Sequence, residues 1–349
     1  MPLFSAIAID ALSAYGFTRG ASGIVDRYIA IAYNTSPRIM AYSWSASGFG
    51  SKYSNPVTLP AGGGQAVAFA PTSNYIAVTH SNAPCVTVYP WSASGFGTKF
   101  TDPATTPTVD AYGVTFNPAG NTIAVAGYST PYIYAYPWSG SGFGTKYSNP
   151  ATLPTGIGNG VAFNPAGTSI AVAHAGYPYV SAYPWSSGFG TKYTDPATPP
   201  AGIGNSVTFN PAGTVAAVTH NTSPYVSAYS WSSGFGTKFT NAATLPTGIG
   251  YGVAFNPDGT AISIGHATTP FISVYPWSAG FGTKYSNPAT LPGNQARATA
   301  FSLKGTSLAV TSLTTSPNIH VYPWSAGFGT KYADPSTLPT TEAYGVAFG

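Results

Sequence analysis

Histidine is the residue type in this chain best suited to metal chemistry, and four of the five histidines occupy one repeat position. Each stands four residues before a proline: His80, His174, His220 and His266. A zinc ion needs its ligand nitrogens at about 2.1 Å, whereas equivalent positions in packed neighbouring sheets lie roughly 10 Å apart. We therefore expect no shared metal. Hydrogen bonding to the turn between strands is the favoured role, and a ligand contact is the alternative.

Carboxylates are too few to suggest a catalytic cage, because the chain has only eight Asp and Glu residues. Three of the eight acidic positions look like caps of a repeated turn, in which Asp and Asn exchange: Asp102, Asp195 and Asp334, with Asn55, Asn149 and Asn287 in other copies. The chain has no G-x-S-x-G elbow, P-loop or His/Cys cluster. We expect no catalytic residues, no metal and no cofactor.

The positions at which the repeats differ are better candidates for a binding site than the repeated ones. Four residues before the Phe that ends the first segment of each repeat, the chain carries Tyr344, Gln65, Tyr112, Asn159, Asn205, Tyr251 and Arg297. Two residues earlier it carries Glu342, Gly63, Asp110, Ile157, Ile203, Ile249 and Gln295. The sequence therefore predicts two opposite sectors of the ring. One brings together Arg297, Glu342, Gln65 and Asp110, and the other consists of three repeats that read GIGN or GIGY and carry no charge at these positions. A binding patch at the mouth of a central channel would consist of Gln65, Asp110, Tyr112, Arg297, Glu342 and Tyr344; solvated loop residues are the alternative.

These positions belong to a unit that repeats through the whole chain. The seven tryptophans are 46 or 47 residues apart, each in a stretch like YPWSAGFGTKY. One unit, residues 160–196, contains four short β-branched and aromatic segments separated by turn residues: Val161–Phe163, Ile170–Ala173, Tyr179–Tyr183 and Gly190–Tyr193. Four strands in about 47 residues match a propeller blade.

The two ends of the chain predict how the ring closes. The chain ends on a first strand, Ala343–Gly349, whereas the first repeat begins on a second strand, Asp26–Tyr33. We therefore expect an all-β fold: a single seven-bladed β-propeller over residues 26–349, with four antiparallel strands per blade and the C-terminal strand paired into the first blade. Residues 1–25 form a separate N-terminal segment, an anchor and linker or a tail packed across one blade.

The repeat resembles known propeller families. The unit AVAFxPxGTxIAVxHxxSPxVxVYPW is similar to WD40-like and YVTN-like repeats, and its near-identical copies resemble those of some bacteriophage virion proteins. The resemblance covers residues 26–349. The chain departs from true WD40 repeats because no Trp-Asp pair ends a strand and no Gly-His precedes each blade, so the WD40 hydrogen-bond tetrad is not carried over.

Charge and the N-terminus limit the classes of partner. A net charge of +4 without any Lys/Arg run lacks the footprint of a nucleic-acid binder. The opening residues have no basic region and are too short to cross a bilayer, so we expect neither a signal peptide nor membrane insertion.

The resemblance implies a non-enzymatic phage virion protein. We expect it to decorate a tail, fibre or capsid, with synthesis in the host cytoplasm. Its partners would be other virion proteins, bound through the N-terminal segment or one propeller face, and a host surface glycan or protein during adsorption. A free carbohydrate-binding propeller lectin is the alternative, and a lactonase-like enzyme is the least favoured interpretation.

Overall fold

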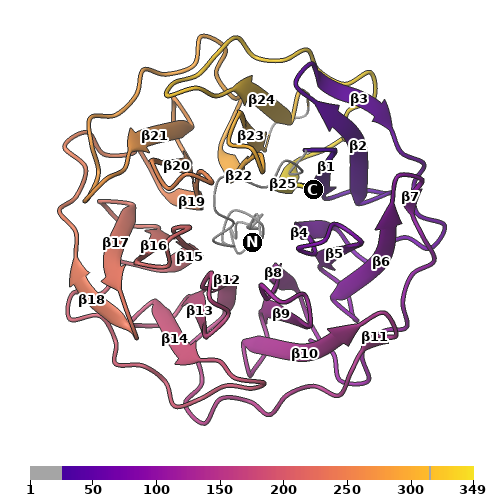
Figure 1. Cartoon of the computed structure of the whole chain (residues 1–349), viewed down its shortest axis with the longest axis horizontal. Coiled ribbons are helices and arrows are strands. Elements are labelled where there is room, and N and C mark those ends of the chain that lie inside the picture. The colour runs from indigo at the N-terminus through magenta and orange to yellow at the C-terminus, as the bar shows by residue number, and fades with distance from the viewer. Residues whose placement is uncertain (1–25, 314–315) are drawn as a thin grey trace.

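Seven small antiparallel sheets are arranged in a ring (Figure 1). The computed structural model describes residues 26–313 and 316–349, and every regular element within them is a β-strand. The predicted N-terminal segment, residues 1–25, lies outside the described residues. The seven-bladed all-β propeller is thus confirmed.

Each blade is an antiparallel sheet whose strands are ordered from the centre of the ring outward (Figure 1). This order follows the chain, except that β25 is the innermost strand of the blade that contains β1. The innermost strands are β25 (Ala343–Phe348), β4 (Gly64–Phe69), β8 (Ala111–Phe116), β12 (Gly158–Phe163), β15 (Gly204–Phe209), β19 (Gly250–Phe255) and β22 (Ala296–Phe301). The second strands are β1 (Tyr28–Tyr33), β5 (Tyr75–His80), β9 (Thr122–Gly127), β13 (Ser169–His174), β16 (Val215–His220), β20 (Ala261–His266) and β23 (Ser307–Ser312). We number the blades 1 to 7 in this order, so blade 1 contains β25 and blade 7 contains β22.

The third and fourth strands form the outer part of each blade. The third strands are β2 (Ile39–Ser45), β6 (Val86–Ser92), β10 (Ile133–Ser139), β14 (Val180–Pro184), β17 (Val226–Trp231), β21 (Ile272–Pro276) and β24 (Ile319–Pro323). The fourth are β3 (Gly48–Lys52), β7 (Gly95–Phe96), β11 (Gly142–Phe143) and β18 (Phe235–Lys238). In blades 4, 6 and 7 the fourth strand is a single bridge, as between Trp185 and Phe189, so the predicted strand Gly190–Tyr193 is wrong for blade 4.

The two longest fourth strands occur where one residue of the third strand differs. Five blades carry a proline before the tryptophan of the third strand, and proline has no N–H to donate to an outer neighbour. Blades 1 and 5 carry Ser43 and Ser230 there instead, and they have the two longest fourth strands. The serine of YSW is therefore associated with the two longest fourth strands, whereas the YPW blades have a two-residue strand or a single bridge.

The ring closes as the sequence predicts. Strand β25 pairs antiparallel with β1, with Val346 opposite Ile31. The N–H of Arg27 donates to the carbonyl of Gly349 at 2.8 Å. The first and last parts of the chain thus share one sheet, in which β25 covers the inner edge of β1.

The hydrophobic core lies between blades. Aliphatic residues of blade 3, including Ile133, pack with Phe163, Val172 and Trp185 of blade 4 in one cluster. The tryptophans are only 3–6% exposed, so they are packing residues and not surface platforms. Because each blade is completed by its neighbour, the ring is one structural unit.

Candidate functional site

Every innermost strand carries a β-bulge at the same place. In blade 4, Gly158 pairs with His174 but Gly160 pairs with Ala173, so Asn159 is the extra residue. We call the residues at this position the bulge ring: Gln65, Tyr112, Asn159, Asn205, Tyr251, Arg297 and Tyr344. These are the variable positions that the sequence singled out. A bulge re-aims a side chain and frequently lies next to a functional site.

The neutral members of the bulge ring show what the position does structurally. Asn159 Nδ2 donates to the carbonyl of Gly204 at 2.8 Å, and Asn205 Nδ2 donates to that of Gly250 at 2.7 Å. Each side chain thus ties its innermost strand to the start of the next blade's. A short amide is sufficient for this link.

Arg297 occupies the same position in blade 7 with a charge that the link does not need. It is 1% exposed, and its guanidinium carbon lies 4.0 Å from the centre of the Tyr251 ring of blade 6, a cation–π arrangement. Burial lowers the pKa of Arg297, and Tyr251, Tyr344 and Glu342 act in the opposite direction. Burying this cation costs free energy. It lies at the end of the ring where the innermost strands begin, which we call the rim.

The residue two positions before each bulge has a fixed backbone and a variable side chain. Its carbonyl accepts an N–H from the loop after the second strand: Tyr128 N–H donates to Asp110 at 2.9 Å, and Asn34 N–H donates to Glu342 at 3.2 Å. Because the main chain carries the structural bond, the side chains are free to differ. Glu342 and Asp110 are the acidic members of this set, and both are half-buried.

The predicted patch separates into two groups, one in blades 7 and 1 and the other in blade 3. Arg297, Glu342 and Tyr344 influence one another electrostatically: burial raises the pKa of Tyr344, Glu342 raises it further, and Arg297 lowers it. Tyr112 Oη donates to Asp110 Oδ2 at 3.2 Å, and burial raises the pKa of Asp110.

Gln65 lies between these two groups. It is the half-buried bulge residue of blade 2, next to β25 on one side and β8 on the other. All six predicted residues thus belong to four consecutive blades, 7, 1, 2 and 3.

Tyr251 is the residue that sequence reasoning left out of the patch. Its ring lies against Arg297, and its hydroxyl donates to Gln295 Oε1 at 3.1 Å. Its own blade reads GIGY, without a charged residue, so the sequence of that blade alone does not single it out. The signal that points to it is the repeat position, since bulge residues reach the neighbouring blade.

The recurring histidines have the structural role that the sequence favoured. In blade 4, His174 Nε2 and the Ser181 hydroxyl of the third strand are 2.9 Å apart, and His80, His220 and His266 have the same kind of partner at 3.0 Å. Burial lowers the pKa of each of them to about 4. Within the described residues, no three His, Cys, Asp or Glu side chains are grouped so as to hold a metal ion.

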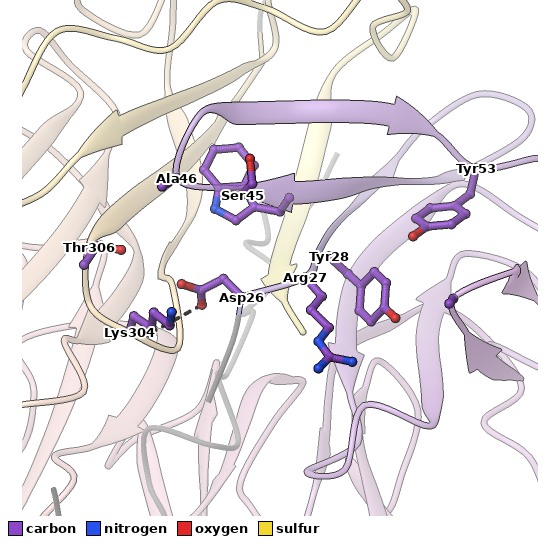
Figure 2. A pocket seen from close by; sticks show the side chains of 10 residues that line it. Asp26, Arg27, Tyr28, Ser45, Ala46, Tyr53, Lys304 and Thr306 are labelled. Atoms are coloured by element: carbon purple, nitrogen blue, oxygen red, sulfur yellow. Dashed lines mark hydrogen bonds between the residues drawn. The ribbon is translucent and has the colours of Figure 1, made fainter. Parts of the chain in front are cut away.

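A pocket of about 420 Å³ lies at the seam between blades 7 and 1, at the opposite end of β22 from Arg297. Figure 2 shows Asp26 facing Lys304, with the Arg27 guanidinium turned away beside Tyr28. The N–H of Lys304 donates to Asp26 Oδ1 at 3.3 Å, and burial raises the pKa of Asp26. None of the predicted site residues lines this pocket, and its buried carboxylate joins the two blades.

The described part of the chain contains no helix that is long and apolar enough to cross a membrane. The sequence matches no family model, and no curated protein is similar to it.

Solved structures match the fold over nearly the whole chain. A putative 6-phosphogluconolactonase from Bacteroides fragilis matches with a TM-score of 0.75 and 14% identity, over 94% of this chain and 99% of that one. A putative 6-phosphogluconolactonase from Bacteroides uniformis matches at 0.66 and 15%, over 93% and 100%. The periplasmic gluconolactonase PpgL of Pseudomonas aeruginosa matches at 0.68 and 15%, over 92% and 98%.

These matches correct the functional expectation. The prediction of a non-enzymatic phage virion protein is contradicted, because these three proteins, which share the fold along nearly their full length, are named as lactonases. The resemblance to propeller repeats holds for the fold. Neither a WD40 assignment nor a virion relationship finds support. At this level of identity the likeness establishes the fold alone, and the named activities belong to those proteins.

Proposed function

We propose that this chain hydrolyses anionic sugar lactones to the corresponding sugar acids, with its site at the rim formed by blades 6, 7 and 1. The observation that carries the proposal is Arg297, a cation that is 1% exposed at a position where Asn159 and Asn205 make the structural link without charge. A buried charge costs free energy, so its presence at one copy of seven favours a role in binding or chemistry.

The charge of Arg297 favours an anionic substrate. A cation inside low-dielectric walls projects its field toward the rim and raises the local concentration of anions. The phosphate or carboxylate of a sugar acid has the complementary charge. The name 6-phosphogluconolactonase, given to two of the similar structures, suggests the same substrate class, whereas the lactone named for the third is uncharged.

The rim also carries groups that lactone hydrolysis can use. Water attacks the ester carbonyl and loses a proton, the ring C–O bond breaks, and the released alkoxide takes up a proton to give the hydroxy acid. We assign Glu342 as the general base, because it is the carboxylate whose charge acts on both Arg297 and Tyr344. We assign to Arg297 the stabilisation, through its field, of the negative charge that develops at the carbonyl oxygen, and to the Tyr344 hydroxyl a hydrogen bond to that oxygen.

The direct test is hydrolysis of 6-phosphoglucono-δ-lactone and glucono-δ-lactone, measured as acid release above the spontaneous rate. We expect the phosphorylated lactone to be the better substrate. Glu342→Gln should lower kcat by about 100-fold or more, the usual contribution of a general base. Arg297→Gln, which installs the residue that blade 2 carries at this position, should lower kcat/KM and abolish the preference for the anionic lactone.

Arg27→Gln is the matched control, since Arg27 lies at the seam pocket away from the rim. This variant should keep full activity while losing the same formal charge. A wild-type rate no higher than the spontaneous one, for both lactones, would refute the proposal. An Arg297→Gln protein that folds and retains normal rates would refute the assigned site.

A further inference from the structure

Four consecutive blades hold an aromatic residue in a left-handed backbone conformation near the rim. These residues follow the loop proline between the second and third strands, with φ between +68° and +72°: Tyr132, Tyr179, Tyr225 and Phe271. We call them the aromatic arc. All four are half-buried, and Phe271 packs in part against the core of blade 7.

The fold itself does not require aromatic rings at this position. Blades 1 and 2 adopt the same conformation with Arg38 (φ +70°) and Cys85 (φ +65°). A positive φ disfavours bulky side chains and suits Gly or Asn. Such conformations persist where the surrounding structure enforces them, and they cluster at ligand-binding sites. Aromatic residues in four blades in succession therefore need another explanation.

The arc is directly continuous with the rim. A Cβ added to Gly158 would lie 2.2 Å from the carbonyl oxygen of Tyr132, and one on Gly204 would lie 2.2 Å from that of Tyr179. These glycines immediately precede Asn159 and Asn205 of the bulge ring. The main chain of Tyr132, Tyr179 and Tyr225 thus lies against the start of the next blade's innermost strand.

The chemistry of this sector differs from that of the charged one. In blades 4 to 6 the position of Glu342 and Asp110 is held by half-buried isoleucines: Ile157, Ile203 and Ile249. Tyr177 is 69% exposed and lies edge-on to Tyr179, with ring centres 5.8 Å apart. Tyrosine rings in the same blades as these isoleucines combine apolar faces with hydrogen-bonding groups.

We propose that the aromatic arc binds the neutral sugar rings of an oligosaccharide whose terminal unit is the lactone at the rim. A pyranose offers an apolar C–H face to an aromatic ring and hydroxyl groups to Tyr and backbone. Among uncharged lactones, the chain's preferred substrate is accordingly an oligosaccharide aldonolactone. This inference rests on the proposed function for its position at the rim, and it names the substrate class of the same site.

The experiment compares cellobionolactone with glucono-δ-lactone as substrates, and cellobionate with gluconate as ligands in calorimetry. We expect the disaccharide to have the higher kcat/KM and affinity. The double variant Tyr179→Gly, Tyr225→Gly should lower both for the disaccharide by about tenfold while leaving the monosaccharide values unchanged. Because glycine suits a positive φ, this variant should not lose thermal stability. Tyr179→Phe, Tyr225→Phe, which keeps the rings, should retain most of the preference.

Cys85→Gly changes the same turn position in blade 2, outside the arc, and should leave the preference intact. Equal kcat/KM and affinity for the two chain lengths, or a preference that survives the double glycine variant, would overturn the inference even if both lactones are hydrolysed. If neither lactone is hydrolysed, the proposed function fails. A disaccharide affinity that still depends on Tyr179 and Tyr225 would then support the arc, and its absence would overturn it.

Discussion

At the scale of single residues, the main lesson concerns repeated and non-repeated polar groups. Each of the four recurring histidines is buried, and its Nε2 is hydrogen-bonded to a Ser or Thr hydroxyl of the adjacent strand. Arg297 occurs once and has no counterpart among the other bulge residues. In a pseudo-symmetric ring, repetition indicates architecture, and departure from it indicates function.

The histidines predict how stability depends on pH. Burial lowers the pKa of all five, His320 included, from 6.5 to about 4, so the folded state favours the neutral form. Their stabilising contribution is complete above pH 6.5 and is lost as the pH falls toward 4, by as much as about 3 kcal/mol per histidine. The Tm should therefore drop steeply between pH 6.5 and 4.

His220→Gln provides the check on this assignment. Glutamine keeps a hydrogen-bonding group but has nothing to protonate, so the Tm of this variant should fall less over the same pH interval than that of the wild type. A wild-type Tm that is constant from pH 7 to pH 4 would show that the histidines do not control acid stability.

At the scale of elements, aromatic packing holds each blade to the one before it. Trp185 lies edge-on to Tyr147 of the connection from blade 3, and to Phe163 and Phe189 of its own blade, with ring centres 5.0–5.3 Å apart. Tyr183 Oη donates to the carbonyl of Thr152 in the same connection at 2.9 Å. Aromatic contacts of this kind stabilise beyond the area that they bury.

Trp185→Ala should destabilise the protein by about 3–5 kcal/mol, the range for removing a large buried aromatic side chain. Tyr183→Phe, which loses only the hydroxyl, should cost about 1 kcal/mol. Denaturant unfolding measures both. A loss below 1 kcal/mol for Trp185→Ala would contradict the role of the tryptophans as inter-blade packing residues.

At the scale of the whole molecule, the sequence predicts the ring but not the side-chain contacts between neighbouring blades. The tryptophan spacing and the split repeat at the two ends were enough to predict seven blades and the pairing of β25 with β1. The variable positions of the repeat coincide with the bulge residues, although the sequence predicts no bulge, and their role in binding stays a prediction. The contact between Arg297 and Tyr251 was missed because it depends on the bulge, which turns a side chain toward the neighbouring blade.

Two further features were beyond a repeat-based prediction. The seam pocket forms where Asp26 and Lys304 take the place of turn residues found at the other blade junctions, so no single repeat predicts it. The function was misassigned because near-identical repeats indicate a way of building a ring, and a ring of this kind serves proteins of unrelated activity.

The most direct test of the account is a crystal structure of the protein with 6-phosphogluconate, the acid product of the proposed reaction. We predict that the acid lies at the rim, with an anionic group directed toward Arg297 and its carboxylate near Glu342 and Tyr344. Product bound in the seam pocket beside Asp26 and Lys304, or a rim that stays empty at saturating product, would contradict the central claim.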